Sequence, residues 1–296
     1  MFQGRSPADM ANVLTEHSRR FAQLRFAYPV VSRRSKGLSL GLNVNPDKVC
    51  NFDCPYCQVD RTVPGADRTV DYGVMLAEID QLMAMAASGE IWQQGKFADT
   101  PAHLRRFNDI AFAGDGEPTT YPRLGDAIRE VHALKQRHGL PDVKTIVLTN
   151  ATLLNRADVL AALEGLKLGP YELWAKLDAG TQPWFELVSG TKLQLGRMVS
   201  NIAKAAAQLE ITIQCMVPTI DGRDPGEAEM QAIAGRIREI EAAGKVRLVQ
   251  IYTTARRPAS DRIGMVADAR LNELAQVVRD KVAAPVETYF GRHWDE

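Results

Sequence analysis

The chain has 296 residues, of which 45% are hydrophobic and 24% are charged, and its formal net charge at pH 7 is zero. This composition is that of a globular protein with one large core, and a neutral chain has no overall electrostatic attraction to nucleic acid. No apolar run approaches the ~20 residues that a membrane-spanning helix needs, and the basic-then-apolar pattern of a secretion signal is lacking. We therefore expect a cytoplasmic protein without a membrane partner.

The first 40 residues carry a basic excess, with seven arginines and lysines against two acidic residues, a net charge of +5. Within them, residues 8–27 interleave apolar positions with arginines and predict a basic amphipathic helix. Such a helix is either a cap on the main domain with a solvated basic face or a contact for a phosphate-bearing substrate. Residues 30–36 are predicted to be an irregular, basic approach to the first strand.

Short apolar segments alternate with amphipathic segments from residue 38 onward. Strands are predicted at residues 38–44, 108–113, 144–148, 171–177, 211–217 and 247–252. Helices are predicted at residues 73–88, 123–138, 155–164, 193–209, 226–242 and 269–283. This alternation predicts an α/β fold, a parallel sheet with helices outside, in six strand–helix units rather than the eight of a full TIM barrel. Residues 1–37 are then a basic N-terminal extension, 38–255 the core, and 256–296 a C-terminal helix and tail packed on that core.

A loop directly after the first predicted strand holds three of the four cysteines, Cys50, Cys54 and Cys57. Thiolates are soft ligands that suit iron–sulfur clusters, zinc or copper(I), and clustered thiols indicate a reducing compartment rather than a disulfide framework. A structural zinc ion would take four protein ligands, but no further cysteine or histidine lies within thirty residues of the loop. The loop therefore favours a four-iron cluster held at three of its irons.

Polar groups also follow the second and third predicted strands, at the end where parallel α/β folds gather their function. The turn Gly114-Asp115-Gly116-Glu117 allows close backbone approach to a ligand, and the Glu117 carboxylate can hold an ammonium group. The alternative is a plain tight turn. Asn150, after the third strand, either hydrogen-bonds ribose hydroxyls or a carboxylate of a ligand, or caps the following helix.

Charged residues end the later strands. Lys176 and Asp178 lie two residues apart and face the same side, where they either meet a ligand or form an ion pair with each other. Arg256 and Arg257 follow the sixth strand and form either a turn that binds phosphate or carboxylate, or a solvated loop. Cys215, within the apolar fifth strand, is predicted to be a buried core residue.

The cysteine loop, with Tyr56 just before its last cysteine, and the Gly116-Glu117 turn resemble the radical S-adenosylmethionine (SAM) superfamily. This resemblance implies a partial (β/α)6 TIM-type barrel and a [4Fe-4S] cluster whose open iron chelates the methionine part of SAM. An electron from the cluster then cleaves SAM and releases a 5′-deoxyadenosyl radical, which abstracts hydrogen from a substrate. The resemblance also implies that the backbone around Tyr56 lies against the adenine and that Gly116 and Glu117 hold the amino group. The candidates for binding the carboxylate and the ribose are Asn150, Lys176 and Asp178.

Longer stretches, at residues 33–41, 51–54, 114–122 and 252–256, are similar to the branch that contains the tRNA 4-demethylwyosine synthases and their uncharacterised bacterial relatives. Those enzymes bind a second cluster through additional N-terminal cysteines, whereas this chain has none before Cys50. We therefore expect the core chemistry with one cluster and not the specific reaction of that branch. The superfamily also implies an electron donor such as a flavodoxin or ferredoxin.

Two kinds of substrate stay open at this point. A nucleoside in RNA, such as tRNA, is favoured by the basic N-terminal segment and by Arg256 and Arg257, which are predicted substrate contacts. A small metabolite or a peptide is favoured by the zero net charge and by the lack of a recognisable RNA-binding motif. A single-cluster electron-transfer or sensor protein is the non-enzyme alternative, although such a protein needs no SAM pocket.

Overall fold

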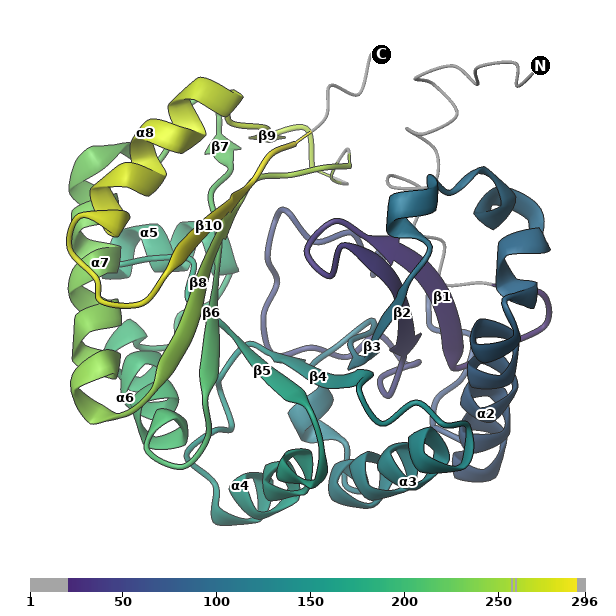
Figure 1. Ribbon diagram of the computed structural model, residues 1–296. Coiled ribbons are helices and arrows are strands. Elements are labelled where there is room, and N and C mark those ends of the chain that lie inside the picture. The colour runs from purple at the N-terminus through teal and green to yellow at the C-terminus, as the bar shows by residue number, and fades with distance from the viewer. Residues whose placement is uncertain (1–20, 257, 259, 292–296) are drawn as a thin grey trace, which may run out of the picture.

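The core of the protein is one sheet of eight strands that curls around a central space, with helices on its outer side (Figure 1). The structure is a computed structural model, and it describes residues 21–256, 258 and 260–291. The strands of the sheet, in spatial order, are β1 (Ala27–Ser32), β2 (Gly37–Leu42), β3 (Phe107–Phe112), β4 (Lys144–Thr149), β5 (Tyr171–Lys176), β6 (Ile211–Met216), β8 (Val246–Tyr252) and β10 (Val286–Tyr289). The α-helices are α2 (Tyr72–Ser88), α3 (Leu124–Arg137), α4 (Ala157–Leu163), α5 (Gln182–Ser189), α6 (Leu195–Ala206), α7 (Gly226–Ala243) and α8 (Asp268–Arg279).

The predicted fold class is confirmed, because all six predicted strand–helix units are present and β2 to β10 run parallel around a partial barrel. Short elements that the sequence did not reveal connect these units. They are the 3-10 helices Glu90–Gln93, Gly95–Asp99, Ala102–Leu104, Pro118–Thr120 and Glu164–Leu168, together with the two-stranded sheet of β7 (Thr219–Ile220) and β9 (Ile263–Gly264). None of the helices in the described part of the chain has the length and apolar character needed to cross a membrane.

The main correction concerns the segment before β2, which was predicted to be irregular. Residues 27–32 form β1, which pairs antiparallel with β2 because the turn of residues 33–36 is too short for a parallel crossover. The predicted helix at residues 8–27 lies mostly outside the described residues, and its last part is wrong because residues 21–26 are non-helical and strand β1 begins at Ala27. The domain division stays a prediction, although β1–β2 pairing crosses the expected boundary at residues 37 and 38.

Alternation along the strands separates the outer core from the interior of the barrel. In β2, Leu38, Leu40 and Leu42 belong to the apolar core, whereas Ser39 and Gly41 line the central cavity. Gly41 is required there, because an added Cβ would lie 2.2 Å from the ring of Tyr28 on the neighbouring strand. The side chains of β2 that point inward are therefore small, and they leave room for a ligand.

The two edge strands of the sheet, β1 and β10, are linked through the β1–β2 turn. Arg33 donates a hydrogen bond to the carbonyl of Phe290, which follows β10. Lys36 lies 3.6 Å from the Glu287 carboxylate of β10 in an exposed ion pair. Exposed pairs of this kind contribute at most about 1 kcal/mol, so these contacts join the edges loosely rather than closing the sheet into a full barrel.

Glu78 of α2 holds the beginning of β1 in place. Its buried carboxylate accepts hydrogen bonds from the backbone N–H groups of Arg25 at 2.8 Å, Phe26 at 2.8 Å and Ala27 at 3.0 Å. A backbone donor without a partner is costly away from water, so one side chain satisfies the turn that aims β1 into the sheet.

We predict that Glu78→Ala lowers the free energy of unfolding by about 3 kcal/mol or more, because up to three backbone donors lose their acceptor. Denaturant unfolding followed by circular dichroism measures the effect. Glu130→Ala removes an exposed glutamate from α3 and serves as the matched control, with an expected change within about 0.5 kcal/mol. Equal effects of the two substitutions would contradict the anchoring role of Glu78.

Candidate active site

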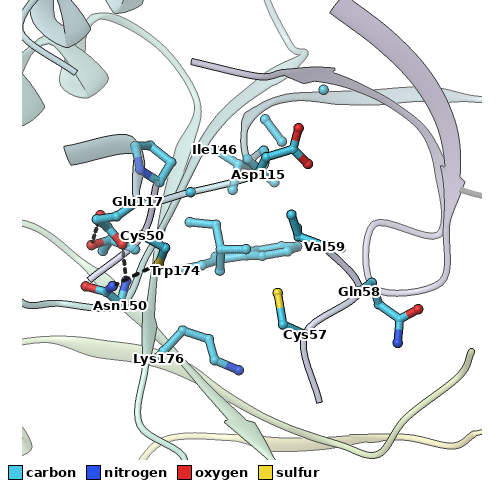
Figure 2. Close-up of a pocket in the computed structure, with 18 of the residues that line it drawn as sticks. Cys50, Cys57, Gln58, Val59, Asp115, Glu117, Ile146, Asn150, Trp174 and Lys176 are labelled. Carbon is cyan, nitrogen blue, oxygen red and sulfur yellow. Dashed lines mark hydrogen bonds between the residues drawn. The ribbon is translucent and has the colours of Figure 1, made fainter. Parts of the chain in front are cut away.

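A cavity of about 330 Å³ occupies the interior of the partial barrel. It extends from the cysteine loop at the carboxyl ends of the strands to Asp109 near the amino end of β3. Figure 2 shows that Cys50, Cys57, Asn150, Trp174 and Lys176 are arranged around this cavity, although they come from separate segments of the chain. The structure thus brings most of the predicted site residues to one place.

The cysteine loop is fixed by contacts to the chain on both sides. Its backbone turns at a hydrogen bond from the N–H of Cys57 to the carbonyl of Cys54 at 2.9 Å. The ring of Phe52 packs edge-on against Phe185 of α5, with 5.8 Å between the ring centroids. All three cysteines line the cavity and are partly buried, and burial raises the pKa of Cys50 and raises that of Cys54 to about 12. A bound cation or a nearby positive group is therefore needed to stabilise their thiolates.

Glu117 is a structural centre of the site as well as a predicted ligand. Its buried carboxylate accepts hydrogen bonds from the Thr119 N–H at 3.1 Å, the Thr119 hydroxyl at 2.6 Å, the Thr149 hydroxyl at 2.6 Å and the Asn150 N–H at 2.6 Å. Burial raises its pKa, and these four donors oppose the rise. Because a carboxylate offers about four acceptor sites, its predicted contact with an ammonium group would require some of these bonds to be exchanged.

The glycines of the Gly114–Glu117 turn allow a close contact with another segment of the chain, and their predicted role toward a ligand stays a prediction. An added Cβ on Gly116 would lie 2.1 Å from the Val49 carbonyl, and one on Gly114 would lie 2.2 Å from Asn43 Oδ1. The turn thus packs directly against the segment that leads into the cysteine loop, and the glycines permit this approach of chain to chain. The turn also lines the cavity, so a ligand in the cavity can still contact the backbone of the turn.

Asn150 connects the end of β4 to the cysteine loop. Its amide nitrogen lies 3.9 Å from the sulfur of Cys50 (Figure 2). The same nitrogen donates to the Asn51 side chain at 2.5 Å, while the amide oxygen accepts from the Thr152 backbone and hydroxyl. The alternative of a helix cap is wrong, since α4 begins only at Ala157. Asn150 therefore positions the loop and lines the cavity at the same time.

Lys176 and Asp178 face the same side, as predicted, and they form an ion pair of 3.0 Å. The Lys176 ammonium also donates to the Tyr252 hydroxyl at 2.5 Å, and the Tyr56 hydroxyl donates to Asp178 at 2.5 Å. Burial would lower the pKa of Lys176, but the Asp178 carboxylate outweighs that effect and the pKa lies above its ordinary value. The ion pair does not exhaust Lys176, because an ammonium group has three donors and the structure uses two of them on side chains.

Arg61, which follows the cysteine loop, is a site residue that sequence reasoning missed. Its guanidinium donates to the sulfur of Cys57 at 3.2 Å, to the Lys48 carbonyl at 3.2 Å and to the Asp115 carbonyl at 3.1 Å. It therefore joins the two ends of the cysteine loop to the Gly114–Glu117 turn and places a positive charge beside a thiol. A basic residue four positions after the last cysteine was the signal that could have revealed it.

Arg34 and Asp109 were also missed, and both face the cavity. Arg34 lies over the rings of Trp174 at 5.2 Å and Tyr252 at 4.9 Å, measured to the ring centroids. Asp109 is only 1% exposed, and burial raises its pKa to about 6, against the opposing effect of the nearby Ser35 and Ser39 hydroxyls. An acidic residue within a predicted strand of the barrel was the signal for Asp109.

The remaining predicted residues fall into three groups. Arg256 lines the cavity near Gln58, whose amide donates to the Arg256 carbonyl at 3.4 Å. Arg257 lies outside the described residues. Cys215 is fully buried in the apolar core, as predicted, and burial raises its pKa well above the ordinary value.

The fold and the site define a class of protein, an α/β partial barrel with a three-thiol loop at the carboxyl end of its first parallel strand. Residues 44–173 match the radical SAM superfamily, so the chain contains a radical SAM domain and is similar to radical SAM enzymes. The predicted resemblance to this superfamily is thereby confirmed. This superfamily implies an iron–sulfur cluster and SAM as cofactors.

Solved structures share this fold at low sequence identity. TYW1 with a lysine–pyruvate adduct bound superposes with a TM-score of 0.54 at 14% identity, covering 94% of this chain and 83% of that one. Streptococcus suis SuiB bound to S-adenosylmethionine gives a TM-score of 0.51 at 13% identity, covering 87% and 49%. These likenesses concern the fold.

Curated relatives are longer proteins. A UPF0026 protein of Helicobacter pylori is 24% identical over 217 residues, which are 73% of this chain and 62% of the relative. A UPF0026 protein of Methanocaldococcus jannaschii is 32% identical over 131 residues, 44% of this chain and 34% of the relative. The GTPase Obg of Brachyspira hyodysenteriae is 24% identical over 247 residues, 83% of this chain and 32% of the relative. The chain thus spans between 32% and 62% of the length of these proteins.

We predict that Asp109→Asn stabilises the protein at neutral pH. The pKa of Asp109 is about 6 in the folded chain and lower in the unfolded chain. The folded protein therefore loses stability as the pH rises from the unfolded-state pKa to the folded-state pKa, because the buried carboxyl must ionise. The gain from Asp109→Asn should therefore be small near pH 4, grow towards pH 7 and level off above it at a value on the order of 2–3 kcal/mol. Thermal unfolding across this pH range measures it, and a gain that does not change with pH would be the opposite result.

Proposed function

We propose that this protein is a radical SAM enzyme that holds one [4Fe-4S] cluster through Cys50, Cys54 and Cys57 and binds SAM beside it. The observation that carries the proposal is that these three thiols, within a domain that matches the radical SAM superfamily, border the same cavity as the predicted SAM-binding residues. An electron-transfer or sensor protein would not need that cavity.

The chemistry of the donor set fits such a cluster. In the described part of the chain, no three histidine, cysteine, aspartate or glutamate side chains converge on a site for a single metal ion. Three soft thiols that border one cavity without meeting at one point suit a cluster, which takes one thiolate per iron. The cations of Arg61 and Lys176 stand near these sulfurs and favour their thiolate form, lowering the pKa of Cys50 and of Cys54 respectively against the effect of burial.

The same cavity offers complementary groups to SAM. We propose that the turn containing Gly116 and Glu117 receives the amino group and that the third donor of Lys176 binds the carboxylate. Asn150 and Asp178 are the candidates for the ribose, and the backbone around Tyr56 for the adenine. Asp178 also positions Lys176 and Tyr56 through its ion pair and its hydrogen bond.

The bound cofactors would supply the electron transfer and the radical chemistry, while the chain binds, orients and shields. Ile146, Leu148 and Trp174 give the cavity an apolar wall next to the polar groups. Such a wall excludes water and strengthens the electrostatic contacts of Lys176 and Arg34 in the interior. A flavodoxin or ferredoxin as the electron donor is part of this proposal.

The substrate is proposed to enter the part of the cavity below the cysteine loop. RNA as a substrate stays a prediction, because much of the basic N-terminal segment lies outside the described residues and Arg25 is paired with Asp67. The structure favours a small substrate instead, since the cavity interior carries its own charged groups at Arg34 and Asp109.

We predict that anaerobic reconstitution yields about four irons and 5′-deoxyadenosine in the presence of dithionite and SAM, and that Cys50→Ala, Cys54→Ala and Cys57→Ala each lose both. Iron analysis, electron paramagnetic resonance of the reduced protein and mass spectrometry of the nucleoside provide the measurements. Cys215→Ala is the matched control, because this buried cysteine lies in the apolar core and should leave iron content and product formation intact.

Two outcomes would count against this proposal. A reduced cluster whose resonance does not respond to SAM, with no deoxyadenosine formed, would favour the electron-transfer or sensor protein. Equal loss of iron in Cys215→Ala and Cys54→Ala would mean that substitution of any cysteine destabilises the fold, and the thiol assignment would then have no support.

We also predict that Arg61→Gln lowers the reduction potential of the cluster. The positive charge and the N–H donor of Arg61 at the sulfur of Cys57 both stabilise the more negative, reduced state of the cluster. The substitution removes both, so reduction becomes less favourable. A redox titration followed by electron paramagnetic resonance measures the potential, with Arg68→Gln, an exposed arginine seven residues further along, as the control. A potential that is unchanged or higher in Arg61→Gln would contradict the contact.

A further inference from the structure

We infer that the lower cavity recognises a small zwitterion of the amino-acid type, with Arg34 binding its carboxylate and Asp109 its ammonium group. The lower cavity is defined as the part lined by Arg34, Ser35, Ser39, Asp109 and Trp174. This inference rests on the proposed function, because it names the class of substrate for that site.

The Asp109 carboxyl has one oxygen that accepts no hydrogen bond in the structure. Its Oδ1 accepts a hydrogen bond from the Ser39 hydroxyl at 2.5 Å, whereas its Oδ2 is buried and no donor reaches it in hydrogen-bond geometry, although the Ser35 hydroxyl lies close enough to oppose the rise of the pKa. A buried carboxylate oxygen without a donor costs more than 1 kcal/mol, which native proteins rarely retain without a use. Because the side chain lines the cavity, a ligand that brings an N–H donor would satisfy it.

The guanidinium of Arg34 has N–H donors that are available to a ligand. The β1–β2 turn carries it into the barrel, where one guanidinium nitrogen donates to the Gln214 side chain at 3.0 Å. Gln214 is itself held by Gln250 through a hydrogen bond of 2.7 Å, and the faces of Trp174 and Tyr252 flank the guanidinium. These contacts fix the orientation of Arg34 but neutralise none of its charge. Among the described residues, no carboxylate lies within ion-pair distance of it.

The two charges face one cavity, yet they do not pair with each other. A ligand with a single charge would satisfy one of them and leave the other exposed to the same desolvated space. A molecule that carries both an anionic and a cationic group satisfies both, and the fixed spacing between them sets the length of ligand that fits. SAM is also a zwitterion, but the groups proposed for its amino acid part are Gly116 and Lys176. Lys176 and Arg34 both lie 4.9 Å from the ring centroid of Tyr252, so the test must distinguish the two ligands.

The test uses the reconstituted full chain and a graded set of probes, the ω-amino acids from glycine to 6-aminohexanoate. Ligand-observed NMR titration gives the dissociation constant of each probe and of the alkylcarboxylate and alkylamine of the same length. We expect one chain length to bind at least about tenfold more tightly than either of its singly charged analogues, which is the contribution of one charged hydrogen bond.

Substitutions then assign each charge. Asp109→Asn should reduce the affinity of the preferred probe to that of its alkylcarboxylate, and Arg34→Gln should reduce it to that of its alkylamine. Arg156→Gln and Asp158→Asn remove an exposed ion pair and serve as matched controls with unchanged titrations. Should either interior variant fail to fold, the length preference of the unmodified protein still decides the inference.

Three results would overturn the inference: no preferred length, full binding in both interior variants, or an equal loss of SAM affinity in both, which would place the pair in the cofactor site. Deoxyadenosine formation separates this inference from the proposed function. If the protein forms deoxyadenosine but binds no probe preferentially, the substrate class alone is wrong. If it forms none but shows the length preference and the two substitution effects, the binding site stands and the proposed function fails.

Discussion

The arrangement of the site depends on one buried carboxylate. Glu117 satisfies donors from Thr119, Thr149 and Asn150, and it thereby fastens the turn after β3 to the end of β4. Asn150 passes this constraint on to the cysteine loop through Asn51. Because each member of such a buried network is costly to leave without a partner, the three segments keep one relative position. The position of the three thiols thus depends on a hydrogen-bond network centred on Glu117, in the turn after β3.

Charges in the cavity differ in how they are balanced. Lys176 is compensated by Asp178 and by the Tyr252 hydroxyl, so this group is stable without a ligand. Among the described residues, Arg34 and Asp109 form no such ion pair, and burial raises the pKa of Asp109 to about 6 although the Lys144 cation opposes this rise. Proteins tolerate unfavourable groups of this kind where function requires them, at the expense of stability. Lys176 is therefore balanced by the protein itself, whereas Arg34 and Asp109 are the groups that we propose a ligand to balance.

Local patterns in the sequence were sufficient for the six parallel strands, their helices and the cysteine loop, because each of these depends on spacing within a short segment. What escaped them depends on contacts between distant segments. The bond from Arg34 to Gln214 spans 180 positions, and no local pattern reveals that the β1–β2 turn points inward. The role of Glu117 was incomplete for the same reason, since its partners at Thr149 and Asn150 lie on another strand.

The contacts that link the two edge strands of the sheet, β1 and β10, can form only late in synthesis of the chain. The contact from Arg33 to Phe290 joins residues 257 positions apart, so it forms only after nearly all of these residues have been synthesised. The cysteines leave the ribosome more than two hundred residues earlier. The cysteine loop is therefore synthesised well before edge strand β10, and this edge of the sheet stays incomplete until the last strand has been made.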